Sequence, residues 1–121
     1  HITTFGGNPL IAASALVTLE EITSTSLIEE TLEKEKLFKT LLVHPLIEEV
    51  RGKGLMLAAI VSSEEIANQV ILEAKDNELI LFWLLFEKRA VRITPPLTIS
   101  KEEIEKGCKI ILAILDKIYK N

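Results

Sequence analysis

The sequence lacks the features that mark several large classes of protein. It has a single cysteine, Cys108, so no disulfide can form within the chain, which is compatible with a reducing cytoplasm. Its 14 basic residues are outnumbered by 18 acidic ones and form no cluster that would suit a nucleic acid. The apolar run LILFWLLF is far too short to cross a bilayer. We therefore expect a cytoplasmic protein that binds neither nucleic acid nor membrane.

A self-contained active site is missing as well. The two histidines, His1 and His44, form no metal-ligand spacing with Cys108, so each is expected to be solvated or structural. The cysteine stands beside isoleucines in a predicted helix, where a small buried hydrophobe is a better interpretation than a nucleophile. Adjacent glutamates fit solvated helix faces rather than a pair of hydrolytic carboxylates. We expect no catalytic residue and no metal site in this chain.

The chain does contain about one domain of regular structure, because 121 residues that are 48% hydrophobic can form a real core. Asn8 and Pro9 suit the N-cap and first turn of a helix over residues 9–23. This helix is apolar nearly all round, which indicates a covering partner, either another domain or another subunit. A second helix carries one apolar stripe and ends before Pro45.

Caps and turns divide the rest of the chain. Ser62 with Glu65, and Ser100 with Glu103, are capping-box patterns that open two further helices. The segment LIEEVRGKGLMLAAIVS predicts two strands around a tight GKG turn, and LILFWLLF and RAVRI predict two more. These elements predict an α+β fold with a small, mostly antiparallel sheet and helices packed on one face.

Two places offer binding chemistry. The first is TTFGGNP, where paired glycines before a helix allow a sharp turn or a close approach to a ligand such as phosphate. The second is Arg92 in VRITPPL, because a charge at an apolar strand end needs a partner. That partner is either an acid of the chain, Glu48 or Glu49, or the carboxylate of a ligand. The residues alone slightly favour the ion pair.

Three segments in order, HITTFGGNPLIAASALVTLEEI, VRGKGLMLA and VRITPPLTISKEEIEKG, resemble the carboxy-terminal part of class III aminotransferases, with the acetylornithine/ornithine branch most similar. The resemblance covers essentially the whole chain. It implies the small domain of a fold-type I pyridoxal-phosphate enzyme, with an interface loop and linking helix in residues 1–24 and the small domain in residues 25–121. The implied activity transfers an ω-amino group from an acetylornithine, ornithine or 4-aminobutyrate type of donor to 2-oxoglutarate, in a homodimer.

The resemblance also implies site residues. Thr4 would contact the phosphate of the neighbouring subunit's pyridoxal phosphate, and Thr3 would lie near the substrate. Arg92 would serve either a substrate carboxylate or an active-site glutamate. The family's catalytic lysine lies upstream, so we expect the isolated chain to be inactive. Since the chain starts on His1 inside a motif, we expect a fragment or processed piece.

Some residues depart from the family pattern. Ala58 stands in place of a glycine, Ile60 and Val61 stand where an acid often follows, and ELILFWLLFEKRA is bulkier than usual. These differences lie near the substrate-side strands, so the amino donor stays open. The alternative to an aminotransferase fragment is a standalone α+β module, descended from such a domain, that binds a partner or ligand without catalysis.

Overall fold

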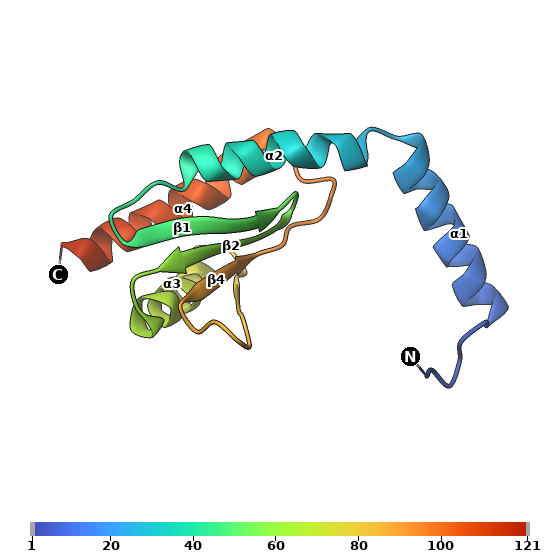
Figure 1. Cartoon of the computed structure of the whole chain (residues 1–121), viewed down its shortest axis with the longest axis horizontal. Helices are drawn as coiled ribbons and strands as arrows, with labels where there is room; N and C mark the ends of the chain where they lie inside the picture. The colour runs from blue at the N-terminus through green and yellow to red at the C-terminus, as the bar shows by residue number, and fades with distance from the viewer. Residues whose placement is uncertain (1, 121) are drawn as a thin grey trace.

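The computed structural model describes residues 2–120, so His1 lies outside the described part of the chain. Its elements, in order, are α1 (Pro9–Ser24), α2 (Leu27–Leu41), β1 (Ile47–Lys53), β2 (Met56–Val61), α3 (Glu64–Asp76), β3 (Phe82–Trp83), β4 (Ala90–Ile93) and α4 (Lys101–Tyr119). The strands form one antiparallel sheet in the order β1-β2-β4-β3. Figure 1 shows α1 projecting away from the sheet and the other helices. The predicted α+β class and antiparallel sheet are confirmed.

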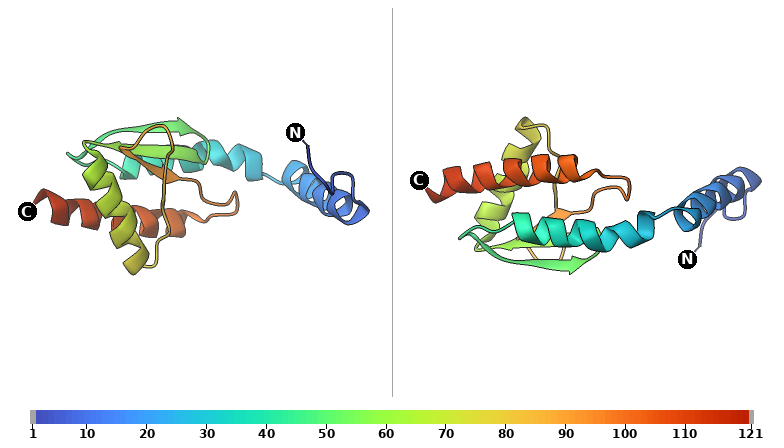
Figure 2. Two further views of the ribbon diagram at one scale, coloured as in Figure 1. Left: turned by 90° about the horizontal axis from the view of Figure 1, so that it is seen from below. Right: turned by 90° about the horizontal axis from the view of Figure 1, so that it is seen from above.

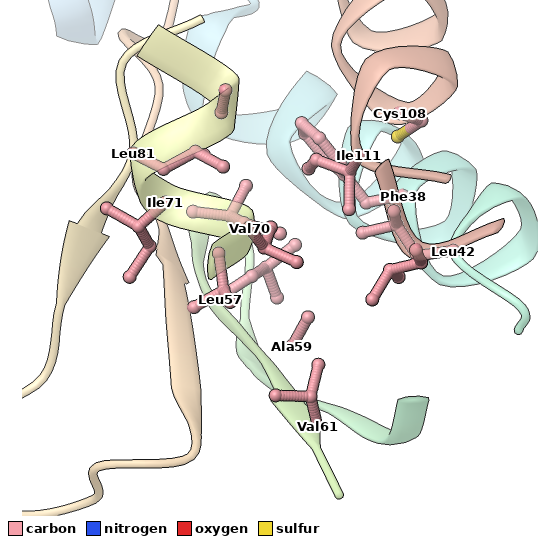
Figure 3. Packing of buried hydrophobic residues seen from close by; sticks show 14 of the residues in the cluster. Phe38, Leu42, Leu57, Ala59, Val61, Val70, Ile71, Leu81, Cys108 and Ile111 are labelled. Atoms are coloured by element: carbon pink, nitrogen blue, oxygen red, sulfur yellow. The ribbon is translucent and has the colours of Figure 1, made fainter. Parts of the chain in front are cut away.

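Helices α2, α3 and α4 lie on one face of the sheet, as Figure 2 shows in its left view. Leu57, Ala59 and Val61 of β2 point toward them, together with Val91 and Ile93 of β4. The helices meet these strands with buried side chains that include Phe38, Val70, Ile104, Cys108, Ile111 and Leu115, some of which are labelled in Figure 3. The opposite face of the sheet carries Ala58, Ile60 and Ala90, which pack with Leu84.

A glycine in the β1–β2 hairpin and a capping box at the start of α4 fix the path of the chain locally. Gly52 has a φ of +128°, and a Cβ there would lie 2.1 Å from the carbonyl oxygen of Met56, so only glycine fits this side of the hairpin. At the start of α4, the Ser100 hydroxyl accepts from the amide of Glu103 at 3.1 Å, and the Glu103 carboxylate accepts from the amide of Ser100 at 2.8 Å. The predicted hairpin and the second capping box are therefore confirmed.

Two local predictions are wrong. The N-cap of α3 is Ser63, whose hydroxyl accepts from the amide of Ile66 at 3.3 Å, whereas the Ser62 amide donates to the Leu46 carbonyl beside β1. In LILFWLLF only Phe82–Trp83 forms a strand. The reason is that the partner strand β4 is short and is entered by a turn in which the Ala90 amide donates to the Glu87 carbonyl at 3.1 Å.

Helix α1 has no buried residue within this chain. Its exposed large apolar side chains are Leu10, Ile11, Leu16, Val17 and Leu19. Between residues 2 and 120, no single helix is long and apolar enough to cross a membrane. Helices α1 and α2 together have the length and composition of a membrane span, but the pair is bent by 67° at the break between them.

Cys108 belongs to the core between α4 and the sheet, which confirms its interpretation as a small hydrophobe. It is 1% exposed, and burial raises the pKa of its thiol to about 12 from an ordinary 9.0. The thiolate is the reactive form of cysteine, so this thiol is inert in the folded chain at neutral pH.

Burial of Cys108 predicts a specific loss of stability in alkali. The unfolded thiol loses its proton near pH 9 while the folded thiol keeps it, so the unfolded state binds fewer protons and stability falls as pH rises from about 9 toward 12. The contribution at about pH 10.5 is on the order of 2 kcal/mol relative to neutral pH. Urea unfolding followed by Trp83 fluorescence measures it. The Cys108→Ala variant is the control and should lack this part of the decline; the same decline in both proteins would contradict the prediction.

Candidate functional site

The amino-terminal loop is shaped by its two glycines. The Gly6 amide donates to the Thr3 carbonyl at 3.4 Å, and the Asn8 amide donates to the Phe5 carbonyl at 3.1 Å, which makes two successive turns. Gly7 has a φ of +77°, a left-handed conformation that favours glycine. A Cβ on Gly6 would lie 2.9 Å from the methyl group of Thr3. The glycines therefore let the loop fold back on itself immediately before α1.

The loop presents polar groups to the outside. The side-chain oxygen of Asn8 accepts from the Leu10 amide at 2.9 Å, and Pro9 occupies the first turn, as predicted. Thr3 and Thr4 are exposed. Within residues 2–120, no hydrogen bond involves either threonine hydroxyl. Two hydroxyls thus lie in the loop that leads into the amino end of a helix, and the dipole of a helix favours an anion at that end.

Arg92 lies at the other candidate place, on β4 and on the face of the sheet without helices. Its strand neighbours are Ala58 of β2 on one side and Phe82 of β3 on the other. The guanidinium carbon lies 4.9 Å from the centre of the Phe82 ring. The Nε atom of Arg92 is buried and has no hydrogen-bond partner among the described residues. A buried guanidinium nitrogen without an acceptor costs free energy. An acceptor for this cation would therefore have to come from outside the described residues.

The acids that could have paired with Arg92 are engaged elsewhere. Glu48 lies 2.9 Å from Arg89, and Glu49 pairs closely with Arg51 on the same strand. The ion pair between Arg92 and Glu48 or Glu49, which the residues alone slightly favoured, is therefore not formed in residues 2–120. Arg89 also contacts Glu87 at 3.3 Å. A backbone hydrogen bond from Arg89 and then its side chain lower the pKa of Glu87.

Helix α2 forms hydrogen bonds to two other segments, the loop after β4 and the turn between β1 and β2. Lys34 is buried, donates to the Leu97 carbonyl at 2.7 Å and pairs with Glu30 at 3.0 Å. The next residue, Glu35, accepts from the Gly54 amide at 2.6 Å and so holds the β1–β2 turn. A hydrogen bond from Lys39 and then that from Gly54 lower the pKa of Glu35. The loop after Arg92 and the hairpin beside it are thus fixed to one helix.

Sequence reasoning missed Phe82 and Lys34. Phe82 is one of several large apolar residues in a continuous run, and no sequence pattern distinguishes it from its neighbours. Its place opposite Arg92 follows only from the strand register. Lys34 stood on the predicted charged face of α2, although its spacing of four from Phe38, which is buried, was a signal that it shares a face with a core residue.

The structure does not bring the two candidate places together. The loop with Thr3 and Thr4 lies at the far end of α1, and Arg92 lies on the sheet (Figure 1). The part of the chain from residue 2 to residue 120 also has no group of three or more histidine, cysteine, aspartate or glutamate side chains that could hold a metal ion.

Comparison with known proteins identifies similar chains over this whole length. The family model described as "Aminotransferase class-III" matches residues 1–115. The acetylornithine aminotransferase of Caldanaerobacter subterraneus subsp. tengcongensis is 33% identical over 98% of this chain and 30% of that protein. This chain thus spans roughly three tenths of the length of the curated relatives that it matches.

Solved structures agree with this comparison. The acetylornithine aminotransferase from Elizabethkingia anophelis is 32% identical and superposes with a TM-score of 0.82 over 97% of this chain and 31% of that one. An ornithine aminotransferase from Toxoplasma gondii, described as having partial occupancy of PLP at its active site, is 27% identical with a TM-score of 0.81 over 99% of this chain and 30% of that one.

Proposed function

The chain belongs to the class III aminotransferases, and from this premise we propose that it works as the carboxy-terminal part of a cytoplasmic, homodimeric, pyridoxal-phosphate-dependent transaminase. The proposed reaction moves an ω-amino group from a donor of the acetylornithine or ornithine type to 2-oxoglutarate. The main support from the structure is Arg92, a cation with a buried, unpartnered Nε atom on the face of the sheet without helices. Such a group suits the carboxylates that these substrates carry.

The amino-terminal turn fits a phosphate group. The Thr4 hydroxyl is exposed without a partner in the described residues, and Thr4 lies in the turns that lead into α1. Hydroxyls and helix-start amides are suitable donors for a phosphate dianion. Thr4 would hold the phosphate of pyridoxal phosphate, and Thr3 would lie toward the substrate. The cofactor, when bound, supplies the electron sink for amino-group transfer.

The exposed first helix supports a division of the chain into two parts with different roles. Residues 1–24 would form the interface loop and the linking helix, and residues 25–121 would form the small domain. Helix α1 exposes large apolar side chains on several sides and buries none within this chain. Burial between two subunits would remove this surface from water, and the threonine loop would then serve the neighbouring subunit's site.

Arg92 would orient the substrate by its carboxylate. The guanidinium offers parallel N–H donors that match the two oxygens of a carboxylate, so one arginine fixes both position and orientation. Strand β4 holds the backbone of Arg92 between β2 and β3, and Lys34 fixes the loop that follows. The proton transfers would belong to the family's catalytic lysine, which the resemblance places upstream of this chain, so we expect the isolated chain to be inactive.

Removal of the Thr4 hydroxyl tests the phosphate role. In the full-length protein that contains this chain, Thr4→Val keeps the side-chain shape and deletes one hydrogen bond to a charged group, worth roughly 1.5–3 kcal/mol. Affinity for pyridoxal phosphate should therefore fall about tenfold to a hundredfold. Equilibrium titration of the apoenzyme with pyridoxal phosphate measures this change. Thr4→Ser, which keeps the hydroxyl, is the matched control and should bind nearly as the unmodified protein does.

Mixed dimers test whether Thr4 serves the neighbouring subunit. A Thr4→Val subunit paired with a subunit that lacks the catalytic lysine has one site with both intact groups if the loop crosses the interface. That site should bind cofactor tightly and turn over, while the other site carries both defects. Mixed dimers that show only the weakened cofactor affinity would place Thr4 in its own subunit's site and refute the inter-subunit role.

Substitution of Arg92 tests the carboxylate role. In the same full-length protein, Arg92→Ala should weaken apparent affinity for 2-oxoglutarate roughly 30- to 150-fold, because a bidentate contact worth about 2–3 kcal/mol is lost. Affinity for pyridoxal phosphate should stay nearly unchanged, since the phosphate contacts lie elsewhere. Arg51→Ala is the control, because Arg51 lies in the same row of the sheet but is already paired with Glu49. Unchanged affinity for 2-oxoglutarate in Arg92→Ala would make Arg92 a structural residue.

A further inference from the structure

Phe82 is the large side chain directly opposite Arg92 in the sheet. The register pairs Phe82 with Arg92 and Arg92 with Ala58, so the guanidinium has an aromatic ring on one side and only a methyl group on the other. The guanidinium carbon lies 4.9 Å from the ring centre, within the range of a cation–π contact. Phe82 is 50% exposed, so core packing does not account for an aromatic residue at this position.

The edge strand that carries Phe82 is itself held in place. Strand β3 has two residues, and a strand this short at a sheet edge has few ladder hydrogen bonds of its own. The indole nitrogen of Trp83 donates to the side-chain oxygen of Asn68 on α3 at 2.6 Å. Leu81, on the other side of Phe82, is buried in the core. Both neighbours of Phe82 are thus fixed, and this fixes where its ring meets Arg92.

An aromatic ring holds an arginine in a way that an acid cannot. A glutamate would neutralise the charge and occupy the N–H donors, as Glu49 does for Arg51. A ring attracts the cation through its face and accepts none of the in-plane N–H bonds. The unpartnered Nε of Arg92 agrees with this difference, because the ring holds the side chain without accepting a hydrogen bond from it.

We propose that Phe82 is a positioning residue, which holds the Arg92 guanidinium against the sheet and leaves its charge and donors available for the substrate carboxylate. This inference rests on the proposed function, because it needs Arg92 to bind that carboxylate. It goes beyond that function by assigning a role to a residue of the apolar segment between α3 and β4.

The test compares ring-removing and ring-keeping substitutions in the full-length enzyme loaded with pyridoxal phosphate. Phe82→Leu and Phe82→Met remove the ring and keep apolar bulk, whereas Phe82→Tyr keeps the ring. Phe86→Leu makes the same change at a fully exposed residue of the same segment and is the matched control. Two quantities are measured: steady-state kcat and KM for 2-oxoglutarate, and the calorimetric Kd for glutarate, a dicarboxylate that has no oxo group to react.

Loss of the ring should raise both KM and Kd about three- to tenfold, as expected for a partly exposed cation–π contact, with kcat changed less than about twofold. Phe82→Tyr and Phe86→Leu should stay near the unmodified enzyme. In an Arg92→Ala background, Phe82→Leu should have no further effect on glutarate binding, because the ring would act only through the arginine.

Each contrary result has a distinct meaning. Unchanged glutarate binding in both ring-less variants, with binding lost in Arg92→Ala, overturns the role of Phe82 and leaves the proposed function intact. A further loss of binding from Phe82→Leu in the Arg92→Ala background also overturns it, because the ring would then act by another route. Unchanged glutarate binding in Arg92→Ala itself refutes the carboxylate role of Arg92, and the role of Phe82 with it.

Discussion

The alternation of side chains along β4 is the constraint on which the arrangement around Arg92 depends. Val91 and Ile93 must point into the core beneath the helices, because burial of apolar surface is the main favourable term in folding. Side chains of a strand point alternately to its two faces, so Arg92 has to lie on the face without helices. The same alternation in β2 puts Ala58 beside it. The core thus decides on which face of the sheet the cation stands.

Arg92 differs from the neighbouring arginines because it has no acidic partner in the described part of the chain. Arg51 is paired with Glu49, and Arg89 is shared by Glu48 and Glu87, so these cations are satisfied within the chain. Exposed pairs of this kind contribute little to stability, but they do occupy the nearby acids. No acid within residues 2–120 is left at salt-bridge distance from Arg92. An aromatic contact is what remains to hold the side chain while its charge is kept.

Local signals allowed much of the fold to be predicted from the sequence. The Asn8-Pro9 helix start, the glycine hairpin and the Ser100 capping box each depend on a few adjacent residues, and each was confirmed. The extent of β3 and the partner of Arg92 depend on which residue of one strand faces which residue of another. This register is set by packing between distant segments, so apolar run length alone overestimated the strand. The roles of Thr3 and Thr4 came from the family resemblance and stay predictions.

The two candidate places also limit how this chain can work. Helix α1 holds the threonine loop away from the sheet that carries Arg92 (Figure 1), and no turn or strand in residues 2–120 brings them together. A ligand that contacted both would need groups from two different chains, or a large movement of α1. The second possibility would leave the apolar surface of α1 to find a new cover within this chain, where the helix-bearing side of the sheet is already filled by α2, α3 and α4. The exposed apolar surface of α1 therefore agrees with the proposal that this helix and its polar loop pack against a partner outside residues 2–120, either another domain or another subunit.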